Sequence, residues 1–156
     1  MRALLLLLLS SSSFAGPVLV DRVAAIVDGQ LVFQSQVEKR ASAQKVSRQV
    51  ARAELIDALL ITKDAHLTTS ESEIDRALDT ILKENNLSRA DFKDLLERQG
   101  SSLAEYREQI GFQLLEMRWL LAHANGASLQ ADDVRLALRE KLLTQLRKRA
   151  VVEVFE

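Results

Sequence analysis

The chain has 156 residues, a formal net charge of −1 and no cysteine, with two histidines and 21 basic against 22 acidic residues. This length suits one domain with a buried core, and the missing cysteines exclude disulfide scaffolds, thiolate zinc sites, iron–sulfur clusters and cysteine nucleophiles. The balanced charge disfavours a dedicated nucleic-acid binder, while 47% hydrophobic residues and a single proline favour a folded, helical chain. No cofactor is expected.

Residues 1–15 have the pattern of a secretory signal peptide. Arg2 gives a positive start, the run 3–9 is apolar, and Ser13-Phe14-Ala15 ends in the small-x-small pattern that a signal peptidase cleaves. Seven apolar residues are too few to cross about 30 Å of hydrocarbon. We therefore expect cleavage after Ala15 and one exported domain over residues 16–156.

A β-hairpin is predicted next, because β-prone runs at 22–27 and 30–33 flank the turn dipeptide Asp28-Gly29. Helical spacing follows and predicts helices over 35–47, 48–66, 70–86, 88–99, 102–124 and 131–149. Four of them begin with a serine and an acidic residue three positions later, the capping-box pattern. These pairs are Ser35/Glu38, Ser70/Glu73, Ser88/Asp91 and Ser102/Glu105.

The last helix carries acidic residues in its first turn and basic residues in its last turn, which complements the helix dipole. Its predicted apolar stripe is Val134, Leu138, Leu142 and Leu146. A short strand follows over 151–155, and it would complete a small sheet because a lone hairpin is marginally stable. The predicted fold class is mainly α with a small β-sheet: a hairpin, about six helices, and a C-terminal helix and strand that return to the hairpin.

Several segments resemble SurA-type periplasmic chaperones and related parvulin-containing foldases. The opening VAAIVDGQLVFQSQVEKR is similar to their hairpin and first helix, and residues 70–75, 85–88 and 106–110 are similar to their later helix starts and turns. Residues 139–155 resemble their C-terminal helix and strand. In that family, parvulin isomerase domains are inserted before the C-terminal helix, where this chain has only the six residues Asn125–Gln130.

The resemblance implies a chaperone core without prolyl isomerase activity. Its function would be that of an ATP-independent periplasmic holdase for unfolded polypeptides, above all outer-membrane proteins in transit. The residues themselves lead us to expect no stable membrane insertion, because no later apolar segment is long enough to span a bilayer, and no nucleic-acid partner, because the charge is balanced. With only two histidines and no suitable carboxylate spacing, no metal site is expected. A weak homo-oligomer stays open.

Helix 102–124 is the strongest candidate for the binding surface, because it is apolar on two sides. One stripe is Leu103, Tyr106, Ile110, Leu114, Met117 and Leu121. We predict that the opposite stripe, Phe112, Leu115 and Trp119, forms a groove for extended client segments, with Phe92 and Leu95 as its other wall. The alternative is that both stripes are core, since large apolar side chains are usually buried.

Three other functions are weighed against the holdase. A structural or adaptor subunit would bury its apolar surface against a fixed partner, and aggregation suppression would separate the two. A prolyl isomerase fails on length, and export and negative charge disfavour a helix-turn-helix DNA reader. The segment 135–149 holds six basic residues against Glu140 alone, which indicates a solvated helix face or a surface that attracts acidic clients or lipids.

Overall fold

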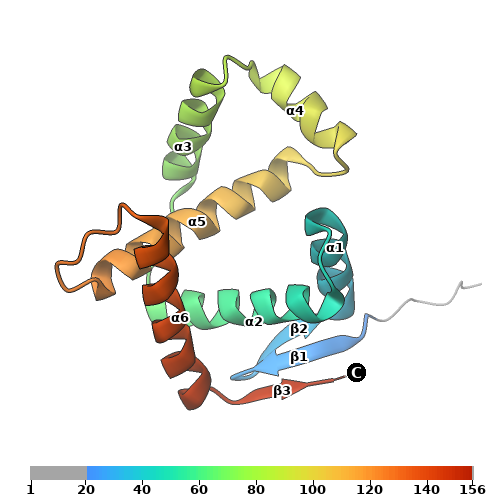
Figure 1. Cartoon of the computed structure of the whole chain (residues 1–156). Coiled ribbons are helices and arrows are strands. Elements are labelled where there is room, and N and C mark those ends of the chain that lie inside the picture. Colours follow the sequence, from blue (N-terminus) through green and yellow to red (C-terminus); the bar gives the residue numbers. More distant parts are fainter. Residues whose placement is uncertain (1–20, 156) are drawn as a thin grey trace, which may run out of the picture.

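The computed structural model describes residues 21–155, so the expected signal peptide and its cleavage site lie outside the described residues. Two strands are followed by six helices and a third strand (Figure 1), which confirms the predicted fold class. The elements are β1 (Val23–Val27), β2 (Gln30–Phe33), α1 (Gln34–Gln44), α2 (Arg48–Ala65), α3 (Glu71–Glu84), α4 (Arg89–Arg98), α5 (Leu103–His123), α6 (Asp132–Arg149) and β3 (Val152–Val154).

The sheet brings the two ends of the described chain together. Its strand order is β2-β1-β3, with both pairs antiparallel. The hairpin turns at Asp28-Gly29, where both residues have positive φ (48° and 87°), as a tight turn of this kind requires. Asp28 also holds β3, because its N–H donates to the Val151 carbonyl and its carboxylate accepts from the Val151 N–H, both at 2.8 Å. The predicted return of the C-terminal strand is therefore confirmed.

Three of the four predicted capping pairs are present. The Ser102 hydroxyl accepts from the Glu105 N–H and the Glu105 carboxylate accepts from the Ser102 N–H, each at 3.2 Å. In the pair Ser70/Glu73, the carboxylate accepts from the backbone N–H and the hydroxyl of the serine, each at 2.9 Å. Ser88 caps α4 by accepting from the Asp91 N–H at 3.1 Å.

The prediction that Ser35 and Glu38 cap the first helix was wrong. Helix α1 begins one residue earlier, at Gln34, and the amide oxygen of Gln36 accepts from the Phe33 N–H at 2.9 Å. The Ser35 hydroxyl donates instead to the Asp21 carboxylate, and Glu38 pairs with Arg48. Because α1 follows β2 directly, the end of the strand at Phe33 determines that the helix begins at Gln34, and Ser35 already lies inside the helix.

The larger core lies between the sheet and the helices α1, α2, α5 and α6. Figure 1 shows α2 between the sheet and α5. Buried residues from the sheet, from α1, from along α2, and from the second halves of α5 and α6 meet here. The bulkiest fully buried side chains of this core are Trp119, Ile61, Leu143, Val32 and Val37.

The stripe predicted for α6 needs one correction. Leu143, which lies outside that stripe, is fully buried, whereas Val134 is exposed. Helix α6 contacts α2 mainly through its second half, where Leu146 is also buried and Arg147 reaches Asp57. The face of a helix that is buried depends on where its partner crosses, and the spacing of leucines alone does not give that crossing point.

A second, smaller core lies between α3, α4 and the first half of α5. Its buried residues are Ile74, Leu78, Leu82, Phe92, Leu96 and Ile110. Figure 1 shows α3 and α4 as two sides of a triangle whose third side is α5. We call this unit the α3–α4 lobe; it shares α5 with the larger core.

Candidate functional site

Helix α5 takes part in both cores through different parts of its surface. Its first half places Ile110, with Tyr106 half-buried beside it, in the α3–α4 lobe. Its second half places Leu115, Trp119 and Leu120 in the larger core. The two apolar stripes predicted for this helix are therefore real, and each is buried over part of its length.

Trp119 is a fixed core residue in this structure. Its side chain is 1% exposed, and its indole N–H donates to the Asp64 carboxylate of α2 at 2.9 Å. The His123 ring lies 5.5 Å away, centroid to centroid, and its Nδ1 is 2.8 Å from the Trp119 carbonyl oxygen. A buried indole with its N–H satisfied has no need of a ligand.

The other predicted binding residues fall into two groups that the structure does not join. Phe92 is buried in the α3–α4 lobe, where its ring meets Tyr106 edge-on at a centroid distance of 4.9 Å, and Leu95 packs half-buried beside that core. Phe112 and Leu115 belong with the larger core. Phe92 and Leu95 thus line a different core from Phe112, Leu115 and Trp119.

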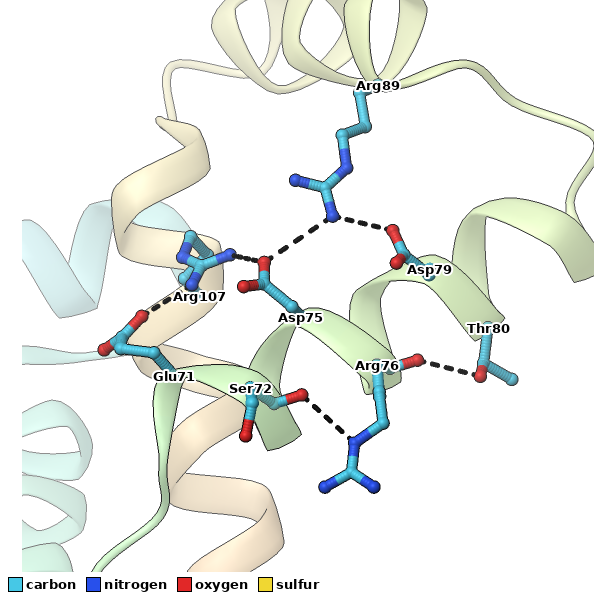
Figure 2. A network of polar contacts seen from close by, with 8 residues as sticks. All are labelled: Glu71, Ser72, Asp75, Arg76, Asp79, Thr80, Arg89 and Arg107. Carbon is cyan, nitrogen blue, oxygen red and sulfur yellow. Dashed lines mark hydrogen bonds and ion pairs between the residues drawn. The ribbon is translucent and has the colours of Figure 1, made fainter.

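A row of carboxylates on α3 fastens the α3–α4 lobe through arginines from both neighbouring helices. Figure 2 shows Arg107 of α5 between Glu71 and Asp75, and Arg89 of α4 between Asp75 and Asp79. The pairs with Arg107 measure 2.6 and 2.5 Å, and those with Arg89 measure 3.5 and 2.7 Å. The pKa of Asp75 is lowered, first by the hydrogen bond from Arg107 and further by Arg89.

This network ties α3 to both α4 and α5. The three carboxylates are spaced four residues apart on one face of α3, so their row is visible in the sequence. Their arginine partners come from positions 10 to 36 residues away, and no local pattern identifies them. The network was therefore not predictable from the sequence.

The joint between α3 and α5 depends on a second charged contact and on a glycine. Glu73 pairs with Arg118, and the pKa of Glu73 falls to about 2 because the Ser70 N–H, Arg118 and the Ser70 hydroxyl all donate to its carboxylate. Gly111 lets the helices approach: a Cβ there would lie 3.1 Å from the Ile74 Cδ1 and 3.3 Å from the Thr69 Oγ1. No local sequence pattern around Gly111 indicates this close approach.

Exposed apolar side chains continue the first stripe of α5 beyond the α3–α4 lobe. Met117 and Leu121 are 39% and 59% exposed, although they follow Ile110 and Leu114 along the same face of the helix. On α6, Val134 and Leu136 are also exposed, and the Arg139–Glu116 ion pair (2.6 Å) links the two helices. We call Met117, Leu121, Val134 and Leu136 the α5–α6 apolar surface.

Three of the six basic residues of α6 form ion pairs with neighbouring carboxylates. Arg147 makes a bidentate contact with the buried carboxylate of Asp57, Arg139 pairs with Glu116, and Arg135 pairs with Asp132. Among residues 21–155 no cluster of three or more side chains has the arrangement of a metal site, and no helix is long and apolar enough to cross a membrane.

Comparisons with known proteins agree with this fold. No family model matches the chain. Chaperone SurA of Aliivibrio fischeri is 31% identical over 123 residues, which cover 68% of this chain and 28% of that protein. A SurA protein of Haemophilus influenzae, described as a peptidyl-prolyl cis-trans isomerase, is 31% identical over 140 residues, or 85% of this chain and 43% of that protein. The chain thus spans less than half the length of these curated relatives.

A solved structure of a SurA-like chaperone from Campylobacter jejuni has the same fold. It aligns with a TM-score of 0.51 and 21% identity, and covers 81% of this chain and 50% of that one. Sequence and fold together place a SurA-like chaperone domain in this chain.

Proposed function

We propose that this protein is an ATP-independent holdase that binds unfolded polypeptides in the periplasm, outer-membrane proteins in transit among them. The observation that carries the proposal is the α5–α6 apolar surface on a domain whose relatives are chaperones. Scattered single apolar residues are ordinary on a surface. Here Met117 and Leu121 continue the stripe whose earlier member Ile110 is buried in a core. A client can therefore contact these exposed side chains without any change in core packing.

We propose further that the function is binding and not catalysis. The carboxylates that gather on α3 are each paired with an arginine from a neighbouring helix. Such pairs keep helices in place, whereas an acid–base catalyst needs a group that is free to exchange a proton with its substrate. The periplasmic location rests on the signal-peptide pattern of residues 1–15.

The test is aggregation suppression by the purified protein. An outer-membrane β-barrel protein is diluted from urea, and light scattering is followed with and without the protein. We expect suppression at near-equimolar ratio and a clear loss for the double variant Leu121→Ser/Leu136→Ser. Val50→Ser is the matched control, because Val50 is a similarly exposed apolar residue (45%) on α2.

Two results would overturn the proposal. A wild-type protein that suppresses the aggregation of no unrelated client behaves as an adaptor with a fixed partner. Equal losses for the double variant and for Val50→Ser would remove the α5–α6 apolar surface from the mechanism.

Client binding at Phe92, Leu95, Phe112, Leu115 and Trp119 remains a prediction. Because these residues are buried or half-buried here, a client can reach them only if the helices around α5 separate. If these buried residues do bind client, the protein should bind more client under conditions that partly separate the helices around α5. Trp119 fluorescence reports that event directly.

A further inference from the structure

The border of the sheet at β3 is an open strand edge. Figure 1 shows β3 at the margin of the sheet, with β1 on one side of it only. The opposite margin, β2, is partly closed because Gln36 accepts from the Phe33 N–H and α1 follows directly. A strand edge presents unpaired backbone donors and acceptors, and these can pair with another extended chain.

The hydrogen bonds to β1 identify which residues of β3 face outward. The Val151 carbonyl accepts from the Asp28 N–H, and the Phe155 N–H donates to the Ala24 carbonyl at 3.0 Å. Backbone groups alternate sides along an antiparallel strand, so those of Val152 and Val154 point away from β1. Within residues 21–155 they make no hydrogen bond.

The side chains at this edge define what a partner strand must carry. Val152 and Val154 pair with Val27 and Ala25, whose side chains are in the core, so they lie on the core face of the sheet. Val154 is nevertheless 48% exposed, because the core ends at this border. Between them Glu153 lies on the outer face opposite Ile26, and it has no ion-pair partner among the described residues.

A second copy of the chain fits this edge poorly. Two β3 strands that pair through Val152 and Val154 about a two-fold axis place Glu153 directly opposite the Glu153 of the other copy. Like charges directly opposite each other on adjacent strands are destabilising. The same position accepts a basic residue well, and the two valines beside it favour apolar neighbours.

We propose that β3 binds an extended polypeptide segment of the pattern apolar–basic–apolar by adding it as a fourth, antiparallel strand. The basic residue lies opposite Glu153, and the apolar residues lie beside Val152 and Val154. This proposal rests on the proposed function, since it gives one place where an unfolded client is held. Main-chain hydrogen bonds supply affinity for any extended client, and Glu153 supplies a preference among them.

The first experiment reverses the charge. A fluorescein-labelled nine-residue peptide with an apolar–Lys–apolar centre, and the same peptide with a central Glu, are titrated by fluorescence anisotropy. We expect wild-type protein to bind the Lys peptide about two- to fivefold more tightly, the size of one cross-strand charge pair. The variant Glu153→Lys should reverse the preference. An equal ratio of affinities in both proteins overturns the proposal.

The second experiment closes the edge. Val154→Pro removes an outward N–H and no bond to β1, so the sheet should remain while peptide affinity falls at least tenfold. Val154→Ala is the control that keeps the N–H. If the proline variant does not fold, amide exchange decides instead: saturating Lys peptide should slow exchange at Val152 and Val154 in the wild-type protein. Bound peptide without that protection overturns the proposal.

These readouts separate the strand site from the holdase itself. If the wild-type protein and Val154→Pro suppress aggregation equally well, the proposed holdase function stands and β3 takes no part in it. Wild-type protein that suppresses no aggregation contradicts the proposed function, while the anisotropy and exchange measurements still decide the strand site. If sedimentation velocity shows a dimer that Val154→Pro abolishes, the edge of β3 binds a second copy of the chain. That result would overturn the proposal that it binds a client peptide.

Discussion

The contact between Asp57 and Arg147 should hold α6, and with it β3, against the rest of the domain. The Asp57 side chain is 8% exposed, and Arg147 donates to both of its carboxylate oxygens at 2.7 Å. Replacing the arginine by methionine keeps most of the apolar stem and removes the charge. Asp57 would then be a buried carboxylate without its cation.

The expected cost follows from burial. Breaking a fully buried ion pair by removing one partner costs about 3–5 kcal/mol. Arg147 is 41% exposed, so water will reach part of the carboxylate once the guanidinium is gone. We therefore expect Arg147→Met to lower the free energy of unfolding by about 2 kcal/mol, and the melting temperature by about 4–8 °C.

Urea unfolding provides the measurement, with Trp119 fluorescence and far-UV circular dichroism as independent probes. Arg48→Met is the matched control: it makes the same change at an ion pair with Glu38 in which both side chains are more than half exposed (74% and 54%). Such a surface pair should contribute less than about 1 kcal/mol. A double-mutant cycle with Asp57→Asn isolates the pair. If Arg147→Met costs no more than Arg48→Met, the reasoning from burial is wrong.

Three further outcomes are expected. A saturating Tyr/Phe-rich outer-membrane-protein peptide should shift Trp119 fluorescence, and an unchanged spectrum would remove this residue from the binding site. Gly111→Val should lower the free energy of unfolding by about 1–3 kcal/mol in urea titrations, because its branched side chain overlaps Ile74, whereas Gly111→Ala should be nearly neutral. Stability should fall as the pH drops from about 4.5 towards about 2, where Glu73 becomes protonated, and Glu73→Gln should flatten the acid limb of the melting temperature against pH.

The sign of that acid effect follows from the direction of the pKa shift. Glu73 has a lowered pKa in the folded protein, so its ionised form stabilises the fold at any pH above its unfolded value of 4.5. The contribution disappears as the pH falls through about 2. A Glu73→Gln variant with the same acid limb as the wild-type protein would show that the Ser70 and Arg118 contacts are not retained in solution.

Part of the fold could be predicted because its causes are local. The turn at Asp28-Gly29 and the caps at Ser88 and Ser102 involve residues within three positions of one another, and the sequence displays both partners. The start of α1 shows the limit of such patterns. Ser35 and Glu38 have the right spacing, yet the adjoining strand sets the helix one residue earlier and Asp21 takes the serine hydroxyl.

The candidate site was much less predictable, because burial depends on which helices cross. The sequence indicated that α5 has two apolar stripes, and it could not indicate where each is covered. Tertiary packing buries Leu115 and Trp119 completely or nearly so, and leaves Leu121 exposed on the stripe that contains buried Ile110. The predicted groove residues were therefore divided between two cores, and the exposed surface lies elsewhere.

By itself the sequence determined the class of the protein: a cysteine-free, mainly helical domain with a hairpin, a returning terminal strand and the segments that resemble SurA-type chaperones. These properties follow from composition, from short-range hydrogen bonding and from hydrophobic period. Only the tertiary structure decided which apolar residues face water, which arginine meets which carboxylate, and that β3 has an open edge with Glu153 between two valines. Those features join residues tens of positions apart, and only the packed chain brings them together.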